Sequence, residues 1–383
     1  MHFDIAIIGA GAAGLHLALA MKNDSFFSSK RILILEKSAK DQNDRTWCFW
    51  EKGAGLWDSL LKKSWETGDF YAAESAVPLN LEPYRYKMLR AIDFYDFAKK
   101  EIQESAIFNW VNDEIQSVES GSPIQIKGLK ENYTADFAFD SRIPEEFLKA
   151  KENYTCLLQH FKGWVIRSKE DTFNPQRFTM MDFRVIWNKS TSFTYVLPLN
   201  KREALVEFTL FTPDLINDAD YDAMLKQYIS EILKLKEYEI VEQEYGVIPM
   251  TDFPFEKYSN GNHIRIGTGG GWVKPSTGYS FKNCERNSRK IIASFKSGKP
   301  LNSGIHKLKF RIYDALFLDV LYRQNKKGPS LFQLMYTKLP VQKILSFLDN
   351  ETSFFQDLSI IAGYPWRPFL KSLLKLAVRR WKD

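Results

Sequence analysis

The chain has little of what marks secreted, metal-binding or membrane-spanning proteins. Its 383 residues include 3 cysteines, Cys48, Cys156 and Cys284, which lie far apart and form no Cys-x-x-Cys pair. We therefore expect neither a disulfide framework nor a metal site, and a reducing cytoplasmic setting fits this cysteine usage. No apolar run reaches the roughly 18 residues needed to cross a bilayer, and the first residues lack the basic region and cleavage site of a signal peptide. The sequence thus predicts neither a spanning helix nor a secretory signal.

Aromatic residues, by contrast, are abundant. The 29 Phe, 17 Tyr and 10 Trp make up 15% of the chain, while hydrophobic residues make up 44% and charged residues 26%. This balance is typical of a globular protein, and the length favours two connected domains. So many rings suit a protein with a long apolar cavity, although they also suit an ordinary core.

Most of the net charge of +6 lies at the C-terminal end, where residues 367–383 carry six Lys and Arg against one acid. A helix over these residues is basic and amphipathic. An anionic membrane surface attracts such a helix; alternatively, its apolar stripe packs on the body of the same protein. Nucleic acid is not an expected partner, because the basic cluster is terminal and no recognition motif accompanies it. The stripe comprises Leu370, Leu373, Leu374, Ala377 and Trp381, and Lys371, Lys375 and Lys382 lie around the other side.

The opening segment, FDIAIIGAGAAGLHLALA at residues 3–20, carries a Gly-x-Gly-x-x-Gly fingerprint between an expected strand and an expected helix. Gly9 allows the tight turn, Gly11 lets a pyrophosphate approach the backbone, and Gly14 lets the helix pack closely on the strand. Phosphates are favoured at such a helix N-terminus, because its free N–H groups and its dipole attract negative charge. The segment therefore predicts a dinucleotide-binding site.

A second apolar run, residues 31–35, delivers Glu36 at its end, 22 residues after Gly14. At this spacing a carboxylate meets the adenosine ribose, and an acid in place of an Arg disfavours a 2′-phosphate. FAD or NAD is thus the expected ligand. We expect FAD, because many flavoproteins begin with this fingerprint, which is an association and not a physical argument.

The middle of the chain indicates that a second sheet is inserted into the nucleotide domain. Residues 86–104 are predicted to form a strand that leads into a helix, and residues 132–141 to return to the first sheet. Between 158 and 211 follow four strand-length runs rich in aromatic and β-branched residues. We expect these runs to form an antiparallel sheet that covers the substrate.

The last third is predicted to complete the nucleotide domain and then to become helical. A short strand enters the glycine cluster at 264–271, a helix begins near Gly278, and apolar runs at 310–322 and 331–348 indicate further helices. The expected class is α/β: a Rossmann-like FAD-binding domain, similar to that of flavin hydroxylases, with an inserted antiparallel domain and a helical C-terminal region. The expected segments are 1–75 and 76–157 for the FAD-binding domain, 158–258 for the inserted sheet, 259–285 for the last FAD-binding segment, and 286–383 for the helical region with its basic tail.

Residues 45–51, RTWCFWE, place two Trp, one Phe and two charges directly after the ribose-binding strand. In this neighbourhood Arg45 could meet flavin phosphate or ribityl oxygens while the rings wall the pocket. Alternatively, the segment is a turn with aromatic anchors.

Two acids are candidates for proton transfer. In the run ALVEFTLF, alternation puts Leu205, Glu207, Thr209 and Phe211 on one face of a strand. If that face borders a cavity, its apolar surroundings raise the pKa of the Glu207 carboxyl toward that of a usable proton donor; if it faces solvent, Glu207 is an ordinary surface residue. Asp182, in the run MMDF, is a second acid in comparable surroundings.

Several segments together resemble the lycopene cyclase family of carotenoid biosynthesis, and the resemblance covers nearly the whole chain. Its specific elements are RTWCFW at 45–50 and PSTGYS within GTGGGWVKPSTGYSF at 267–281. The further similar segments are MLRAIDFYDF at 88–97, FDSR at 139–142, QHFKGW at 159–164, FTYVLPL at 193–199 and VEFTLF at 206–211.

The resemblance implies a flavoprotein that uses FAD in its reduced form, with NADPH as reductant, in a reaction without net redox change. The implied substrate is lycopene, a lipophilic linear polyene, and the product carries β-ionone rings. A proton adds to C2 of the acyclic ψ end, the C5=C6 double bond captures the C1 cation, and loss of a C6 proton leaves the ring. The resemblance also implies a peripheral position on the cytoplasmic face of the cell membrane, with contact to other enzymes of the carotenoid pathway.

On this resemblance Glu207 is the acid or acid/base, and the sequence surroundings described above make Asp182 a second catalytic candidate. Phe208 follows Glu207 where many relatives have a second carboxylate, so a mechanism with two adjacent acids does not apply. Thr268 stands where flavin hydroxylases have an Asp for the ribityl oxygens, and its hydroxyl binds more weakly than a carboxylate. The expected cofactor-binding residues are Gly9, Gly11, Gly14, Glu36, Arg45, Arg90, Gly267, Thr268 and Gly269.

Other functions fit the same scaffold. An FAD-dependent monooxygenase or an isoprenoid reductase would consume one reductant per turnover, whereas a carotenoid-binding flavoprotein without activity would return its pigment unchanged. The sequence also leaves open whether one or both ends of the polyene are closed, and whether the ring is β or ε.

Overall fold

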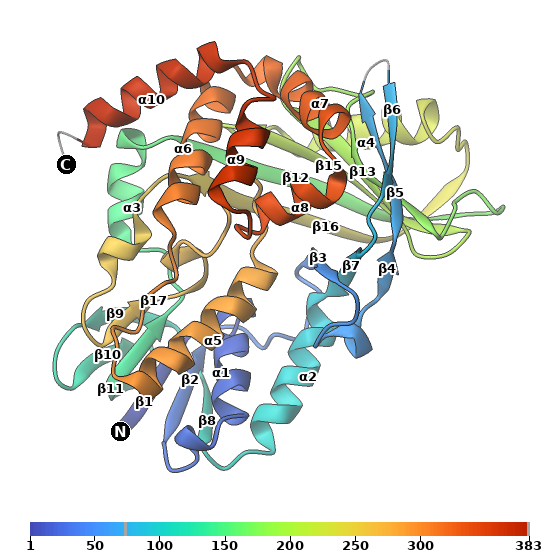
Figure 1. Ribbon diagram of the computed structural model, residues 1–383. Coiled ribbons are helices and arrows are strands. Elements are labelled where there is room, and N and C mark those ends of the chain that lie inside the picture. Colours follow the sequence, from blue (N-terminus) through green and yellow to red (C-terminus); the bar gives the residue numbers. More distant parts are fainter. Residues whose placement is uncertain (73–74, 381–383) are drawn as a thin grey trace.

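The structure, a computed structural model, describes residues 1–72 and 75–380. Two seven-stranded sheets and one three-stranded sheet form its framework. In Figure 1 the N-terminal strands and their helices occupy the lower half, and the second large sheet lies above them under the C-terminal helices. This is the interleaved α/β architecture that the sequence predicts.

The fingerprint segment forms β1 (His2–Ile8) and α1 (Ala12–Lys22), and the second apolar run forms β2 (Ile32–Glu36). β1 is central, because it pairs in parallel with β2 and with β11 (Asn132–Asp140). Both of its faces are buried, which is why its apolar run is uninterrupted. The helices α2 (Ala91–Gln103) and α5 (Phe281–Ser297) pack with α1. The other strands of this sheet are β8 (Phe108–Asn112), β9 (Ile115–Glu119), β10 (Ile124–Gly128) and β17 (His263–Arg265).

The second large sheet contains the four predicted strands. They are β12 (Cys156–Ser168), β13 (Arg177–Asp182), β14 (Ser192–Pro198) and β15 (Glu203–Thr212), and the sheet continues with β16 (Tyr238–Thr251), β5 (Thr67–Ala72) and β6 (Ser75–Asn80) in the order β16-β12-β15-β14-β13-β5-β6. This sheet is thus not confined to residues 158–258, because β5 and β6 join it from the first segment, and β5 pairs in parallel with β13. β13 ends at Asp182, whose carboxylate accepts the backbone N–H of Arg184 and turns the chain out of the sheet.

Residues 46–52 form a strand, β3 (Thr46–Lys52), which pairs with β7 (Tyr84–Arg90), and β7 pairs with β4 (Lys63–Trp65). The aromatic segment is therefore not a turn. Its side chains divide between the two halves of the molecule: Phe49 stacks on Phe281 of α5, whereas Trp50 packs in the upper core and donates its Nε1–H to the Leu345 carbonyl at 3.2 Å. β3 consequently connects the nucleotide half to the upper half.

The apolar run at 310–322 forms one helix, but the apolar run at 331–348 forms two, because Pro340 disfavours a helical conformation at Leu339. Two helices lie earlier in the chain, α3 (Glu145–Ala150) and α4 (Asp218–Glu231). Helix α4 covers the face of the second sheet that is opposite to the C-terminal helices. No helix of the described residues is both long and apolar enough to span a membrane. The C-terminal helices are α6 (Leu308–Arg323), α7 (Gly328–Lys338), α8 (Val341–Leu348), α9 (Phe354–Ile361) and α10 (Trp366–Arg380).

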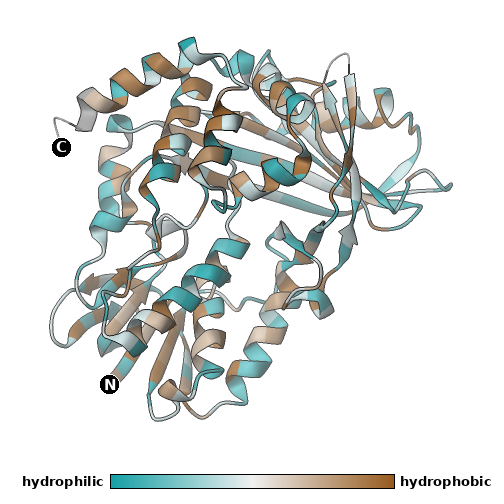
Figure 2. Ribbon diagram, in the orientation of Figure 1, coloured by the Kyte–Doolittle hydropathy of each residue, from teal (hydrophilic) through white to brown (hydrophobic). Residues whose placement is uncertain are grey.

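Helix α10 is attached through its polar side. Ser372 and Lys375 bind Asp319 of α6 at 2.6 and 2.8 Å, and Arg323 donates to Ser372 at 2.6 Å. The apolar stripe, in contrast, is exposed, with Leu374 at 61%. In Figure 2 the hydrophobic residues of α10 are the brown segments of the helix at the top of the molecule. The alternative in which this stripe packs on the body is therefore not the observed arrangement; Trp381 and Lys382 of the predicted helix lie outside the described residues.

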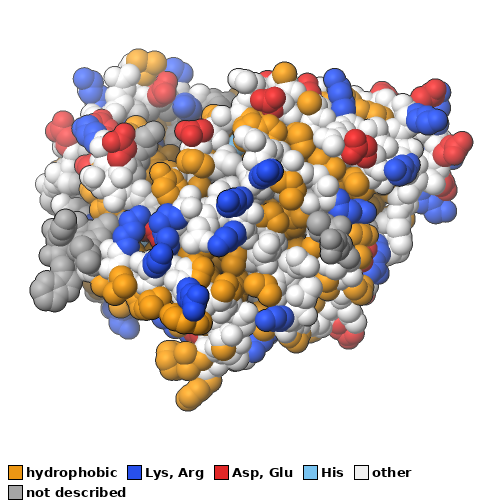
Figure 3. Space-filling view, turned by 90° about the horizontal axis from the view of Figure 1, so that it is seen from above, with side chains coloured by type: hydrophobic (Ala, Val, Ile, Leu, Met, Phe, Trp, Pro, Cys, Tyr) orange, Lys and Arg blue, Asp and Glu red, His pale blue; other side chains and the backbone are white. Residues whose placement is uncertain are grey.

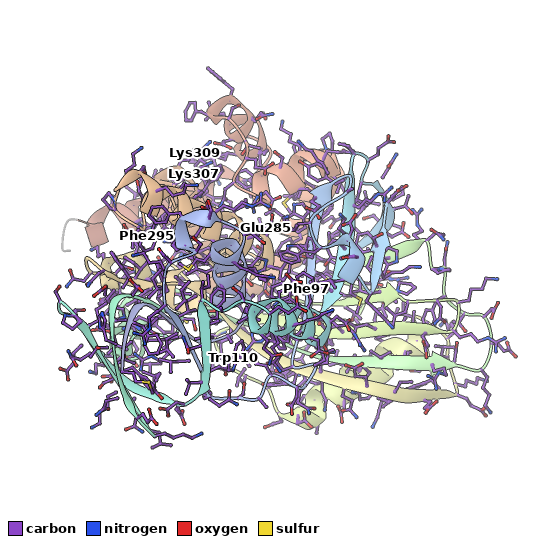
Figure 4. The ribbon with its side chains drawn as sticks, turned by 90° about the horizontal axis from the view of Figure 1, so that it is seen from below. Phe97, Trp110, Glu285, Phe295, Lys307 and Lys309 are labelled. Carbon is purple, nitrogen blue, oxygen red and sulfur yellow. The ribbon has the colours of Figure 1, made fainter. Side chains whose placement is uncertain are left out.

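A buried ionic network ties β3 and β7 to α5. Lys87 is inaccessible and donates to Glu51 at 2.9 Å and to Asp58 at 2.5 Å. Lys282 then connects Glu51 to Glu285, with bonds of 2.8 and 2.6 Å. Figure 4, from below, labels Glu285 on α5 in the nucleotide half.

We predict that Lys87→Met lowers the free energy of unfolding by about 3 kcal/mol, since it removes the buried cation between Glu51 and Asp58 and leaves Glu51 with Lys282 alone. The measurement is urea denaturation followed by circular dichroism. Lys149→Met is the control, because Lys149 forms only an exposed pair with Glu145, and it should leave the unfolding midpoint unchanged. Equal midpoints for the two variants would contradict the prediction.

Candidate functional site

A cleft of about 340 Å³ opens at the carboxyl ends of β1 and β2. Gly11 and Glu36 line it on one side, and Arg142 and Thr268 line it on the other. In α/β folds, nucleotides bind in the crevice at the carboxyl ends of parallel strands. The cleft is therefore in the position that the fingerprint predicts.

The three fingerprint glycines have different tasks. Gly9 has a φ of 93°, and a Cβ there would lie 2.0 Å from Ser141 Oγ. A Cβ on Gly14 would lie 2.0 Å from the carbonyl oxygen of Gly9. A Cβ on Gly11, however, would meet no atom within 4 Å, so its backbone faces open space. The fold needs Gly9 and Gly14, whereas the open space at Gly11 leaves room for a bound group.

Glu36 is held in place at the end of β2. Its Oε2 accepts the backbone N–H of Ala10 at 2.7 Å, and its Oε1 accepts the N–H and the hydroxyl of Ser38 at 2.9 and 2.8 Å. Burial raises the pKa of this carboxyl, but the hydrogen bonds and the charge of Lys40 outweigh burial and hold the pKa below its ordinary value. Glu36 thus presents a fixed carboxylate at the cleft, where a ribose hydroxyl can donate to it.

The glycine turn after β17 borders the cleft through Gly267 and Thr268. The turn η5 (Gly267–Gly270) follows β17, and a Cβ on Gly269 would lie 2.1 Å from the carbonyl oxygen of Arg142. Further along, Gln159 Oε1 and Thr277 Oγ1 are buried polar atoms without a hydrogen-bond partner in the described part of the chain. Such atoms are rare in a folded protein unless a ligand or water satisfies them. Neither atom lines the nucleotide cleft, so a ligand or water elsewhere would satisfy them.

The two predicted cofactor arginines differ in position. Arg45 lines the cleft, and its side chain is 60% exposed. Arg90 does not line the cleft: it precedes α2, and its guanidinium binds Asp93 at 3.0 Å. The structure brings Arg45 to the nucleotide position and ties Arg90 to its own helix.

A second pocket, of about 360 Å³, lies between the second sheet and helices α6 to α10. Its lining is almost entirely aromatic and aliphatic. Trp50 and Tyr195 lie at its inner end, and Trp366 and Leu373 of α10 lie at its surface end. A pocket with such walls binds an apolar ligand.

Glu207 lies on the pocket face of β15. As predicted, alternation divides this strand, because Phe211 packs in the core beside the pocket and Phe208 packs under α4. The cross-strand neighbours of Glu207 are Tyr195 on β14 and Gly163 on β12.

A second carboxyl, to which no sequence pattern pointed, lies in the same row. Gly163 pairs on its other side with Glu244 of β16, and since Gly163 has no side chain, the carboxyls of Glu207 and Glu244 meet over it as hydrogen-bonding neighbours. Thr46 donates to Glu244 Oε2 at 2.6 Å, and Thr209 donates to Glu207 Oε1 at 2.9 Å. Arg45 and Trp47, on either side of Thr46, line the nucleotide cleft.

Burial raises the pKa of Glu207 well above its ordinary value. The charge of Glu244 and the hydrogen bond to it raise this pKa further, whereas the hydrogen bond from Thr209 lowers it. Burial also raises the pKa of Glu244, but the hydrogen bonds from Thr46 and Glu207 oppose this effect. Burial and mutual repulsion therefore disfavour charging both carboxyls, and the hydrogen bond from Thr46 favours Glu244 as the charged member.

Tyr195, the cross-strand neighbour of Glu207, lines the apolar pocket, whereas Glu207 and Glu244 are not among its lining residues. The hydroxyls of Tyr86 and Tyr279 lie 3.2 Å apart, and Tyr279 is hydrogen-bonded to Tyr195. Tyr195 and Tyr279 both line the pocket. Burial raises the pKa of these phenols and of the nearby Cys48 thiol, so all of them stay neutral. The acid of Glu207 consequently stands in uncharged surroundings apart from Glu244.

Asp182 does not join this pair. It is inaccessible, and Arg184 binds both of its oxygens, at 2.9 and 2.5 Å. Tyr228 of α4 donates to it at 2.7 Å, so Asp182 lies toward the face that α4 covers, away from the pocket face of Glu207.

A third cavity, of about 650 Å³, lies on the other side of η5 and has a mixed polar and apolar lining. Several of its cations are ion-paired: Lys274 binds Asp314 at 2.9 Å, and Arg286 binds Asp349 at 2.9 Å. These pairs connect the segment before α5 with α6, and α5 with the end of α8, so they stabilise the fold.

The fold and its nucleotide cleft define a class, the FAD-dependent monooxygenase, halogenase and reductase fold. A geranylgeranyl bacteriochlorophyll reductase-like protein from Thermoplasma acidophilum is similar with a TM-score of 0.60 and 12% identity over 98% of this chain and 99% of that chain. The flavin-dependent brominase Bmp2 is similar with a TM-score of 0.57 and 14% identity over 100% of both chains. The anhydrotetracycline hydroxylase OxyS from Streptomyces rimosus has a TM-score of 0.59 and 13% identity over 91% of this chain and 76% of that chain. At these identities the likeness establishes the fold alone.

The particular family follows from the sequence profile described as "Lycopene cyclase protein", which matches residues 4–374. The chain belongs to the lycopene cyclase family, which confirms the resemblance, and it is an enzyme. No curated protein sequence matches the chain.

Proposed function

We propose that this protein is a lycopene β-cyclase, which closes the ψ ends of lycopene into β-ionone rings without net redox change. The proposal is supported by one arrangement above all. In a chain of the lycopene cyclase family, the protonated carboxyl of Glu207 stands beside tyrosines that line an apolar pocket, close to a nucleotide cleft.

The chain's own residues supply what the cyclisation needs. Glu207 donates its proton to C2 of the ψ end, because burial raises the pKa of its carboxyl well above the ordinary value. Trp50, Tyr195 and Tyr279 exclude water, which would otherwise capture the cation, and their rings stabilise positive charge. The resulting carboxylate then accepts the C6 proton, so the enzyme ends in the protonation state in which it began.

In this proposal FAD occupies the cleft, held at Gly11, Glu36, Thr268 and Arg45. In its reduced form, with NADPH as the reductant, it would supply an electron-rich ring near the developing cation. Since the cyclisation consumes no electrons, NADPH is needed in catalytic amounts only. A monooxygenase or an isoprenoid reductase would oxidise one NADPH per product.

We predict that cells that accumulate lycopene convert it to cyclic carotenoids when they express this chain, and that Glu207→Gln abolishes the conversion while FAD remains bound. The Gln side chain keeps the shape of Glu but has no proton to donate. Chromatography of the extracted pigments and the flavin spectrum of the purified protein are the measurements. Glu203→Gln is the matched control on the same strand, because Glu203 binds Arg167 at the surface, and it should leave the product unchanged. Entirely acyclic pigment with folded, flavin-loaded parent protein would overturn the proposed function.

A second prediction concerns the nucleotide. Gly11→Val should weaken FAD binding about tenfold or more, because its side chain fills the space in which the pyrophosphate approaches the backbone. Titration of the apoprotein with FAD, followed by flavin fluorescence, measures the effect. The far-UV circular dichroism should not change, since a Cβ at this position meets no atom within 4 Å. Undiminished affinity for FAD would contradict this placement of the cofactor.

We also propose that the protein docks on the cytoplasmic face of the cell membrane through α9 and α10. Phe355 and Leu358 of α9 and Trp366 and Leu374 of α10 are exposed, at 82%, 46%, 66% and 61%. Figure 3 views this side of the molecule, where apolar side chains lie among Lys and Arg. The apolar pocket opens among these helices, so a substrate dissolved in lipid could enter without crossing water.

We predict that the protein sediments with vesicles that contain phosphatidylglycerol, and that Leu374→Glu weakens this binding roughly tenfold by removing one buried leucine from the interface. High salt should weaken it as well, because the basic residues act through charge. Leu215→Glu is the control, since Leu215 is 50% exposed in the turn after β15. Equal sedimentation of both variants and the parent chain would contradict this docking surface.

A further inference from the structure

We infer that Glu244 is the second carboxyl of the site: it shares a single proton with Glu207 across Gly163 and positions that proton for transfer to the substrate. This inference rests on the proposed function, which it deepens. Glu244 acts through Glu207 and is a positioning residue.

The register of three strands brings the two carboxyls together. In one row across the sheet, Glu207 of β15 pairs with Gly163 of β12, and Gly163 pairs with Glu244 of β16. A Cβ on Gly163 would lie 3.0 Å from Glu244 Cγ and 2.9 Å from Leu205 Cδ1, so any other residue would stand where the carboxyls meet. The glycine is thus part of the arrangement.

The hydrogen bonds around Glu244 leave one oxygen for a shared proton. Its Oε2 accepts the hydroxyl of Thr46, whereas its Oε1 is buried and has no other donor among the described residues. A buried carboxylate oxygen without a donor is unfavourable. The carboxyl of Glu207 is the neighbour that can supply the donor.

The same geometry explains why Phe208 does not disable the site. Successive residues of a strand point to opposite faces, so a carboxylate at position 208 would enter the core under α4, where Phe208 now packs. Such a group could not share a proton with Glu207. In this chain the second carboxyl on the pocket face comes from Glu244, two strands away.

The groups that face the pair favour one proton in it. The neighbours of Glu207 are the neutral Cys48, Tyr195 and Tyr279, and Glu242 is the further acid near Glu244. No cation of the described residues is among the groups that shift either carboxyl. Two bare carboxylates would repel each other here, and one shared proton removes that repulsion.

The proton count of the cyclisation stays balanced. Glu207 gives its proton to C2 of the ψ end and becomes a carboxylate, and the ring cation then returns its C6 proton to the pair. Between the two transfers Glu244 remains a carboxylate bonded to Thr46. The pair as a whole begins and ends with one proton.

The experiment is a pH titration of the purified holoenzyme by infrared spectroscopy of the protonated carboxyl band, together with the pH profile of cyclisation. The parent chain should keep one protonated carboxyl at neutral pH, and Glu207→Gln should lose it. Glu244→Gln should move the loss of the band, and the alkaline limb of kcat/KM, to lower pH by about one to three units, because Glu207 loses the neighbouring negative charge that raises its pKa. Glu239→Gln is the control on the same strand, since Glu239 is exposed beside Arg167, and it should change neither.

A second variant keeps both carboxyls. Gly163→Ala should move the band and the alkaline limb in the same direction as Glu244→Gln, since its Cβ separates the two groups. If Glu244→Gln and Gly163→Ala both titrate like the parent chain, the shared proton is refuted even where cyclisation occurs. If the parent chain forms no cyclic product, the proposed function fails, while the infrared titration still decides for or against the shared proton.

Discussion

The burial of a carboxyl beside another carboxyl is the constraint on which the rest of this site depends. An isolated glutamate at the protein surface is ionised at neutral pH and cannot protonate a carbon–carbon double bond. Here the walls of the second sheet, the neutral tyrosines and the negative neighbour all disfavour a second charge, so Glu207 keeps its proton. The fold has to hold these groups together, because neither carboxyl is stable in this position without its partners.

The strand β3 is the element that joins the parts of the site. Its first residue, Thr46, binds Glu244, the flanking Arg45 and Trp47 border the nucleotide cleft, and Trp50 closes the inner end of the apolar pocket. One short strand thus contacts the carboxyl pair, the cleft and the pocket. The buried network around Lys87 fixes this strand to β7 and α5, which makes the geometry of the site a consequence of the core beneath it.

The C-terminal helices are attached through polar contacts and leave apolar side chains exposed. Helix α10 binds the body through Asp319 and Ser372, and its leucines remain outside, although burying them would stabilise an isolated protein. An exposed apolar surface of this kind, at the mouth of an apolar pocket, is consistent with a ligand and a partner that are themselves apolar. Helices α9 and α10 therefore serve both the proposed membrane contact and the proposed entry of the polyene.

The sequence by itself determined the elements whose patterns are local. The uninterrupted apolar run of β1, the spacing of Gly9, Gly11 and Gly14, and the position of Glu36 predicted the nucleotide cleft, and the alternation along β15 predicted the face on which Glu207 lies. Only the tertiary structure decided which side chains share that face.

Glu244 lies 37 residues beyond Glu207 in the sequence. The pattern of its own strand does not indicate that β16 pairs with β12, or that Gly163 leaves room between the carboxyls of Glu207 and Glu244. Asp182 has surroundings in the sequence similar to those of Glu207, yet Arg184 and Tyr228 hold it away from the pocket. The reason is that the residue pattern of a strand indicates which of its faces is buried, whereas pairing between distant segments determines which strands lie next to it.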